Sequence, residues 1–421
     1  MTDFLAGAAI RVTTPSPALL SADRTWLWGY GDRAGPCRRV DQDLNARALA
    51  IADPLGGRVV LISADIGALD RAMTDRVKAR IAAAHPDLGP ARICLNVSHT
   101  HYAPVAATIP TWQLGVGFVD PGYQAFLEDQ IVGAAADALA AMRPASLAWG
   151  RGATRISRDR HPLPDGSHND PTVDVLRATD TVGRTIAVVF STACHPTAHF
   201  HTDDANGVSY DDGVSADFPG FARSYIEAEF GGVGLFLQGY AGTCVPINGL
   251  TDESIGRTLA SSVGGILREG MEDLSGTIGA WLTEIFLPIQ YLDPATLPGV
   301  AANAPSYGTA VSDLGPLLTR WVARMQALGG RIPASLPTPM QAIQIGAPPS
   351  ACHIVASGHE VTTDFAPRAR ALWPFPRVTV IGYSNAQLAY LTSAAVILHA
   401  DDRANFPYAR ANYEAGTACL W

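Results

Sequence analysis

Charged residues are scarce in this sequence, and basic residues are the scarcer kind. Asp, Glu, Lys and Arg make up 16% of the 421 residues, hydrophobic residues make up 48%, and the formal net charge is −9. Such a composition excludes a disordered chain. The acidic balance argues against a nucleic-acid partner, which needs a basic face, and against adsorption to anionic lipid. The composition and length therefore indicate a large globular protein with enough interior to bury a sizeable core.

Long apolar runs, leader segments and paired cysteines are missing as well. No apolar run is long enough to cross a bilayer, so no stable membrane insertion is expected. Residues 1–7 lack a basic stretch followed by an apolar one, so no secretion signal is expected. The six cysteines are scattered without a CxxC pair, which favours reduced thiols in the cytoplasm over a disulfide framework.

Strand-like and helix-like patterns alternate along the whole chain. The expected strands cover residues 6–15, 44–52, 59–66, 93–97, 146–160, 173–178, 185–192, 234–239, 278–287, 352–356 and 378–383. The expected helices cover residues 71–84, 123–142, 218–230, 253–270 and 315–328, with one more ending near 371. This alternation predicts an α/β fold with mostly buried sheets. No linker divides the chain, so we expect one domain over residues 1–421, with any peripheral elaboration in 271–340.

The most informative stretch is the apolar run of residues 93–97 that leads into Ser98-His99-Thr100-His101. On a strand, the spacing of His99 and His101 would place both imidazoles on the same face. A buried strand that delivers two imidazoles is a common beginning of a metal site. Two histidines that only make hydrogen bonds are an equally good interpretation of this motif alone.

Three more expected strands lead into residue types that bind metals, namely His195, Glu360 and Tyr390. Four such strand ends in one chain suggest that they gather around a common centre. Asp65 also ends a strand, where it could orient a histidine or cap the helix at 71–84. His199 and His201 follow His195 in a polar loop, and we expect loop residues that at most support the site.

Short motifs around these residues give the sequence a family resemblance. In chain order they are Ser-His-Thr-His at 98–101, Cys-His-Pro-Thr at 194–197, Gly-His-Glu-Val-Thr-Thr at 358–363 and Tyr-Leu-Thr at 390–392. Supporting matches lie at 6–8, 14–15, 46–48, 63–65, 238–246 and 413–416, so that nearly the whole chain is covered. The sequence is similar to the catalytic domain of neutral ceramidases, which are zinc-dependent amidases.

The resemblance implies a mixed β-sheet core flanked by helices, with one Zn²⁺ ion per chain at the C-terminal ends of strands. The family's zinc ligands fall on His99, His195, Glu360 and Tyr390. The residues that contact substrate or the tetrahedral intermediate fall on His101, Arg158 and Tyr413.

The chemistry implied for this site is hydrolysis by a metal-bound water. Zn²⁺ would lower the pKa of that water toward about 7. His101 would act as acid or base, and a tyrosine or arginine would stabilise the oxyanion. The arginine assignment has a rival, because the family's Asn-Arg step reads Ser157-Arg158 here and Arg160 lies on the same strand face.

The chain departs from the family pattern at residues 242–247, where the family's Gly-Asp-Val-Ser-Pro-Asn reads Gly-Thr-Cys-Val-Pro-Ile. Val245 replaces a serine sometimes proposed as the nucleophile, which favours attack by metal-bound water. Cys244 is a much poorer nucleophile in its apolar setting. The chain also ends shortly after Tyr413, so the C-terminal β-sandwich domain of full ceramidases is not expected.

The leading interpretation is a cytoplasmic zinc-dependent hydrolase that cleaves an amide bond in a soluble or modestly apolar small molecule. A true ceramidase is the first alternative, and an ester or lactone hydrolase would use the same site. A metal-dependent lyase or isomerase would instead use His101 or Tyr413 as a proton shuttle. The substituted segment 243–245 leaves room for a non-catalytic binding protein, against which the four intact ligands argue. Mn²⁺, Fe²⁺ or Co²⁺ could replace zinc, and a homo-oligomer is a further option.

Overall fold

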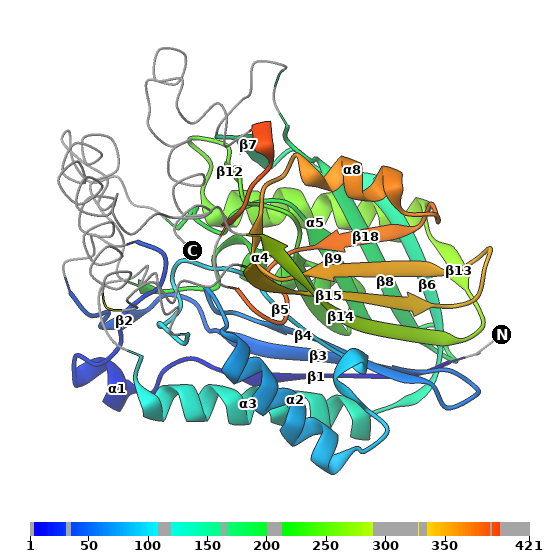
Figure 1. Cartoon of the computed structure of the whole chain (residues 1–421), viewed down its shortest axis with the longest axis horizontal. Coiled ribbons are helices and arrows are strands. Elements are labelled where there is room, and N and C mark those ends of the chain that lie inside the picture. The colour runs from blue at the N-terminus through cyan, green and yellow to red at the C-terminus, as the bar shows by residue number, and fades with distance from the viewer. Residues whose placement is uncertain are drawn as a thin grey trace.

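The structure is a computed structural model, and it describes residues 4–30, 35–107, 119–160, 166, 168–199, 213–288, 327, 335–387 and 390–395. Within these residues, nine strands form a large mixed sheet (Figure 1). From edge to edge its path is β11 (Val233–Gln238), β9 (Thr185–Thr192), β8 (Thr172–Asp180), β6 (Arg143–Ala153), β1 (Phe4–Val12), β3 (Asn45–Ala52), β4 (Arg58–Ala64) and β5 (Ile93–Val97), with β13 (Glu272–Leu274) paired to β6. The two terminal pairs are parallel and the pairs between them antiparallel. The predicted α/β fold with a mixed sheet is confirmed.

Helices cover one face of the large sheet. They are α2 (Arg71–Ala84), α3 (Pro121–Ala140), α4 (Asp217–Phe230) and α5 (Asp252–Glu269). Helix α3 packs on β1 and β3, α4 packs on β11, and α5 packs on β6 and β8. Strand side chains alternate between faces, so that Ala48 and Ala50 of β3 meet the helices while Leu49 and Ile51 point the other way.

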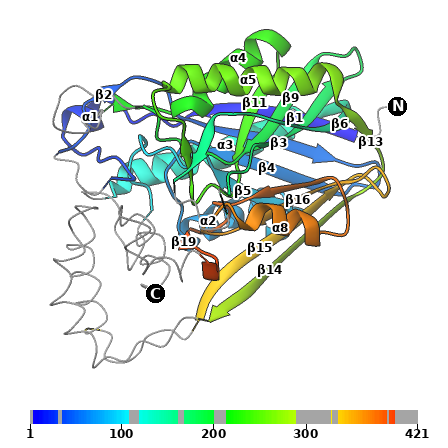
Figure 2. The ribbon, with the colours of Figure 1, turned by 90° about the horizontal axis from the view of Figure 1, so that it is seen from above.

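A second sheet covers the opposite face. Its strands are, in order, β14 (Ile278–Pro288), β15 (Ser335–Ile345), β16 (Cys352–Ser357) and β18 (Val378–Ile381). Ile343 and Ile354 of this sheet share one apolar cluster with Leu61 of the large sheet. Helix α8 (Phe365–Leu372) packs on β18 through Ala366 and Val380. Figure 2 shows the large sheet between α4 and α5 on one side and β14 and β15 on the other.

The two ends of the large sheet lie against each other. Gln238 of β11 donates its backbone N–H to the Asn96 side chain of β5 over 2.9 Å. Ser63 of β4 donates to the Phe236 carbonyl over 2.5 Å. Since β11 and β5 are the outermost strands of the path, these bonds show that the sheet curls back on itself. The chain that leaves β5 and the chain that leaves β9 therefore come together.

Shorter elements complete the described chain: α1 (Pro17–Ser21), the 3₁₀ turn Pro90–Arg92, and the strand pairs β2 (Arg39–Val40) with β10 (Gly213–Val214), β7 (Ser157–Asp159) with β12 (Cys244–Pro246), and β17 (Glu360–Val361) with β19 (Tyr390–Leu391). Side-chain caps begin α1, α2, α3 and α5. Asp70 accepts the Met73 N–H at the start of α2, and Asp120 caps α3 just before Pro121.

Strand β15 was not expected from the sequence, because Pro337 and Pro339 interrupt its pattern. In the structure both prolines lie in the part of β15 that pairs with β14 alone, while the pairing with β16 begins at Met340. A missing N–H is tolerated where one side of a strand is unpaired.

Of the helix expected at 315–328, the structure describes only residue 327, and the single domain over 1–421 stays a prediction. No helix in the described ranges is long and apolar enough to cross a membrane.

Candidate metal centre

His99 lies just after β5 and is fully buried in a left-handed backbone conformation, with φ 65°. Its Nδ1 lies 2.5 Å from the carbonyl oxygen of Gly67. Because a carbonyl oxygen only accepts, Nδ1 carries the proton and the lone pair of Nε2 faces the opposite way. A left-handed non-glycine residue costs about 1–3 kcal/mol and is found where its surroundings hold it for a purpose.

His195 follows β9, and its Nδ1, like that of His99, faces backbone carbonyl oxygen. Its Nδ1 lies 2.7 Å from the carbonyl oxygen of Ala241 and 3.1 Å from that of Cys244. The backbone N–H of His195 donates to the same Cys244 oxygen over 2.9 Å. Burial lowers the pKa of His195, which favours the neutral ring with a lone pair on Nε2.

Glu360 faces both imidazoles from the segment that follows the second sheet. Its Oε2 lies 3.4 Å from Nε2 of His99 and 3.4 Å from Nε2 of His195. Its Oε1 accepts a hydrogen bond of 2.7 Å from Gln387.

These atoms form a group of buried acceptors. Within the described residues, Nε2 of His195 and Oε2 of Glu360 have no hydrogen-bond partner. Lone pairs that face one another at this distance are unfavourable unless a cation lies among them. Imidazole nitrogens and a carboxylate oxygen suit Zn²⁺ and similar divalent ions. The residues present therefore fit a metal ion.

His101 lies beside this group. Its Nε2 is 3.2 Å from Nε2 of His99, and one nitrogen from each of His99, His101 and His195 fits within a span of 4.8 Å. Tyr30 packs edge-on against the ring of His101, with centroids 4.9 Å apart. A Cβ on Gly29 would lie 2.3 Å from Cγ of His101, so only glycine allows this approach. The Gly-rich sequence of residues 28–33 gives no sign of this packing.

Tyr390 lies opposite Glu360 in the parallel register of β17 and β19. Arg160 donates Nη2 to the Tyr390 hydroxyl over 3.2 Å and to the Gly242 carbonyl over 2.7 Å. Arg158, the arginine expected at the site, donates Nε to Asn248 over 3.0 Å. The contacts described thus bring Arg160 to Tyr390 and Arg158 to Asn248. Tyr413 lies outside the described residues.

The segment that departs from the family pattern supports the site from outside. The Cys244 thiol donates to Asn169 over 3.0 Å, and burial raises its pKa to about 12, so it is not a reactive nucleophile. Val245 pairs with Arg158 between β12 and β7. The Thr243 hydroxyl accepts the Thr363 N–H over 3.2 Å.

Asp65 has a different role from either one expected. Both of its carboxylate oxygens accept hydrogen bonds of 2.7 Å from Arg223 of α4, and one also accepts the Asn45 N–H over 2.9 Å. The cap of α2 is Asp70. The expectation that Asp65 orients a histidine or caps a helix is therefore wrong.

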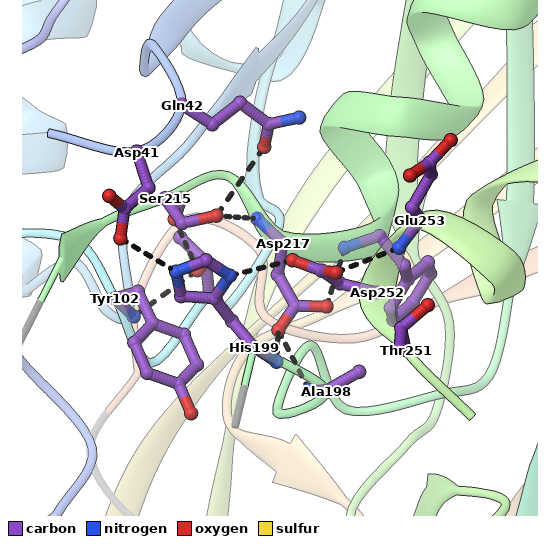
Figure 3. A network of polar contacts seen from close by, with 12 residues as sticks. Asp41, Gln42, Tyr102, Ala198, His199, Ser215, Asp217, Thr251, Asp252 and Glu253 are labelled. Atoms are coloured by element: carbon purple, nitrogen blue, oxygen red, sulfur yellow. Dashed lines mark hydrogen bonds and ion pairs between the residues drawn. The ribbon is translucent and has the colours of Figure 1, made fainter. Parts of the chain in front are cut away.

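His199 lies in a network of carboxylates, four residues after His195 in the chain (Figure 3). Its two ring nitrogens contact Asp252 and Asp41, at 2.6 Å and 3.1 Å. Its backbone N–H donates to Asp217 over 3.0 Å. His201 lies outside the described residues.

Comparisons with known proteins support the fold. No protein-family model matches the sequence, and no curated protein matches it. The structure is similar to neutral ceramidase from Pseudomonas aeruginosa, with a TM-score of 0.71 and 20% identity over 99% of this chain and 74% of that chain. A ceramidase complexed with C2 gives a TM-score of 0.73 and 19% identity over 99% of this chain and 75% of that chain. The chain has the fold of a neutral ceramidase catalytic domain, and the expected resemblance is confirmed at the level of fold.

Proposed function

We propose that the protein is a zinc-dependent hydrolase that cleaves an amide bond in a small substrate. The observation that carries this proposal is the group of buried acceptors formed by His99, His195 and Glu360, in which both imidazoles present Nε2 to one carboxylate oxygen. The choice of an amide is supported by the names of the two similar structures, both ceramidases.

Four side chains would hold the ion: His99, His195, Glu360 and Tyr390. When bound, a divalent ion supplies Lewis-acid chemistry, which acidifies water and polarises a carbonyl group. Carbonyl oxygens behind His99 and His195 fix their tautomers, and Gln387 fixes the carboxylate of Glu360. Such outer contacts keep ligands oriented before the ion arrives.

His101 is the proposed acid and base. Its ring lies beside Nε2 of His99 and is held in place by Gly29 and Tyr30. A neutral imidazole at this position accepts a proton from the attacking water and delivers it to the departing amine nitrogen. Because an amide leaves poorly as an anion, protonation of that nitrogen is required for the C–N bond to break.

Arg160, which donates to the Tyr390 hydroxyl, is proposed to stabilise negative charge on the carbonyl oxygen during the reaction. The two groups are hydrogen-bonded over 3.2 Å, which fixes a cation at the edge of the site. Donors that are oriented in advance are among the strongest contributors to such reactions. Arg158 and Tyr413 remain proposed substrate contacts.

The proposed partner is a soluble or modestly apolar small molecule in the cytoplasm. Nucleic acid is not among the proposed partners, because the formal net charge is −9. Assembly into a homo-oligomer is compatible with this activity.

The first test is the metal content of purified protein, measured beside His195→Ala and the control His85→Ala. His85 lies at the end of α2, away from the candidate centre. We expect about one zinc per chain in the wild type and the control, and none in His195→Ala with its fold retained. A wild type that binds no metal even after incubation with zinc would contradict the proposal.

The second test is a panel of N-acyl amides of increasing chain length, ceramide included, with matched esters and lactones. Chelation should abolish amide cleavage, and added zinc should restore it. A zinc-loaded protein that cleaves only esters or lactones would correct the bond type and leave the metal centre in place.

A further inference from the structure

The ring of His199 is held on both sides by carboxylates from distant segments (Figure 3). Nδ1 lies 2.6 Å from Asp252, the first residue of α5, and Nε2 lies 3.1 Å from Asp41, which directly follows β2. An ionised carboxylate only accepts hydrogen bonds, so both ring nitrogens must donate. His199 is therefore an imidazolium, a fixed cation with no lone pair for proton transfer.

A third carboxylate holds the backbone at the same place. Asp217, the first residue of α4, is fully buried and has a left-handed backbone with φ 57°. Its Oδ2 accepts the N–H of Ala198 over 2.8 Å and the N–H of His199 over 3.0 Å. Both bonds fall on the turn that leads away from His195, so this carboxylate fixes the path of the chain just after the proposed ligand.

The same network braces the turn that carries the other histidines. The Tyr102 ring packs edge-on against His199, with centroids 5.0 Å apart. The Tyr102 carbonyl accepts the Ser215 N–H over 2.9 Å, and the His101 N–H donates to the Pro196 carbonyl over 3.3 Å. The turn after His195 and the turn after His99 are thus joined to each other and to the start of α4.

The charge of His199 balances this network. The carboxylates of Asp41, Asp217 and Asp252 all face the turn, and Arg39 neutralises Asp41 through bonds of 2.6 Å and 2.9 Å. Glu253, the next acidic residue of α5, accepts hydrogen bonds from Tyr225 and Arg257 and does not contact His199 among the contacts described. A neutral side chain at position 199 would leave Asp217 and Asp252 without a cation among these contacts, and partly buried carboxylates without a partner are costly.

We propose that His199 is a positioning residue for the metal centre, whose cationic ring ties Asp41 to Asp252 and so holds the turn that presents His195. The link to metal binding rests on the proposed function, whereas the ordering of the turn does not.

A dependence on pH follows from this arrangement. Burial alone would lower the pKa of His199, but the hydrogen bonds to Asp252 and Asp41 raise it above its ordinary value of 6.5. A raised pKa means that the stabilisation is complete below the ordinary value and is lost as the pH rises through the folded-state value. Burial also raises the pKa of Asp217, to about 7. The stabilisation linked to its protonated form is therefore also lost as the pH rises. We therefore expect the turn to loosen above neutral pH.

The decisive experiment measures amide hydrogen exchange over residues 195–199 in the metal-free full-length protein. The variants are His199→Gln, which can donate to one carboxylate only, and Asp252→Asn, which removes the charge of the other partner. His85→Gln is the matched control, a histidine at the end of α2. We expect exchange at Ala198 and at position 199 to be at least tenfold faster in both variants, and unchanged in the control.

Zinc affinity, measured by competition with a chelator, is the second readout. Changes to residues behind metal ligands typically lower affinity about 10–100-fold, and we expect a loss of this size in His199→Gln. The ratio of wild-type affinity to His199→Gln affinity should fall as the pH rises above neutrality, because proton release by the ligands acts on both proteins alike. A pH profile of this kind separates positioning by charge from simple packing.

Wild-type exchange rates and wild-type zinc affinity in both variants would overturn the inference while leaving the proposed function intact. A wild type without zinc affinity would contradict the proposed function, and the exchange comparison would still decide the role of His199. Should His199→Gln fail to fold, Asp252→Asn provides the same two comparisons.

Discussion

At the scale of single residues, the position of His101 depends on a neighbour that has no side chain. Gly29 and Gly56 both have left-handed backbones, with φ 103° and 86°. A Cβ on Gly29 would collide with the His101 ring at 2.3 Å, whereas a Cβ on Gly56 would meet nothing within 4 Å. Alanine substitutions at the two positions therefore distinguish the effect of backbone strain, present in both, from displacement of the His101 ring, expected only at Gly29.

We predict that Gly29→Ala lowers kcat for amide hydrolysis by at least tenfold while zinc content stays near one per chain. The added methyl group displaces His101, and small misplacements of a catalytic group cost up to about 100-fold in rate. Gly56→Ala, the matched control, should keep wild-type kcat because it introduces strain alone. Steady-state kinetics and metal analysis of both proteins check the prediction. Equal losses in the two variants would contradict a positioning role for Gly29.

A second prediction distinguishes the two arginines of the β7 region. Arg160 donates to the Tyr390 hydroxyl, while Arg158 donates to Asn248. If Arg160 stabilises the developing oxyanion, Arg160→Ala should lower kcat about 10²–10³-fold. Arg158→Ala should act mainly on KM, as the loss of a substrate contact would. Kinetics of the two variants at matched zinc occupancy test this, and a larger kcat loss in Arg158→Ala would reverse the assignment.

The sequence could indicate His99, His195 and Glu360 because each follows a strand and lies within a recognisable motif. It could not choose between Arg158 and Arg160, because residues two apart on a strand share a face. Only the course of the chain near Gly242 and Tyr390 shows which arginine contacts Tyr390. A glycine that makes room for a neighbouring ring, as Gly29 does for His101, carries no chemical signal of its own.

At the scale of elements, a buried ion pair joins the end of β4 to α4. Asp65 and Arg223 have side chains 0% and 1% exposed and make two hydrogen bonds of 2.7 Å. Burial, together with Arg223, lowers the pKa of the nearby Arg47 to about 10, although Glu227 and Asp65 raise it. The carboxylate of Asp65 is therefore required for the guanidinium of Arg223 to stay buried.

We predict that Asp65→Ala lowers the free energy of unfolding by about 3–5 kcal/mol, because it leaves a buried cation without its partner. Asp75→Ala is the matched control. Asp75 pairs with Arg71 at the surface of α2, and its loss should change stability by about 0.5 kcal/mol or less. Urea unfolding of the metal-free proteins measures both values. A loss below about 1 kcal/mol in Asp65→Ala would show that water reaches Arg223.

Most helices could be predicted because their signals are local. Residues 71–84 have helical periodicity and a capping aspartate, and the structure has the same bounds. Strand β15 could not be predicted, because the acceptability of Pro337 and Pro339 depends on which neighbouring strand is present. The role of Asp65 was hidden for a similar reason, since its partner Arg223 lies 158 residues away.

At the scale of the whole molecule, the candidate metal centre joins parts of the chain that belong to different sheets. His99 and His195 leave two strands of the large sheet, while Glu360 follows the last residues of β16 in the second sheet. The convergence depends on the curled large sheet and on its packing against the second sheet. A bound ion would therefore hold both sheets together at one end.

The last prediction concerns this coupling. A ligand that binds only the folded chain stabilises it by about 2.7 kcal/mol at a hundred times its Kd. We expect saturating zinc to raise the Tm of the wild type by several degrees and a chelator to reverse the change. Since His195→Ala lacks one of the three buried acceptors, its Tm should be the same with and without zinc. Zinc binding to the unfolded chain would act on both proteins alike, so the difference between them isolates the folded site. Equal Tm shifts in the two proteins would place the bound zinc elsewhere on the molecule.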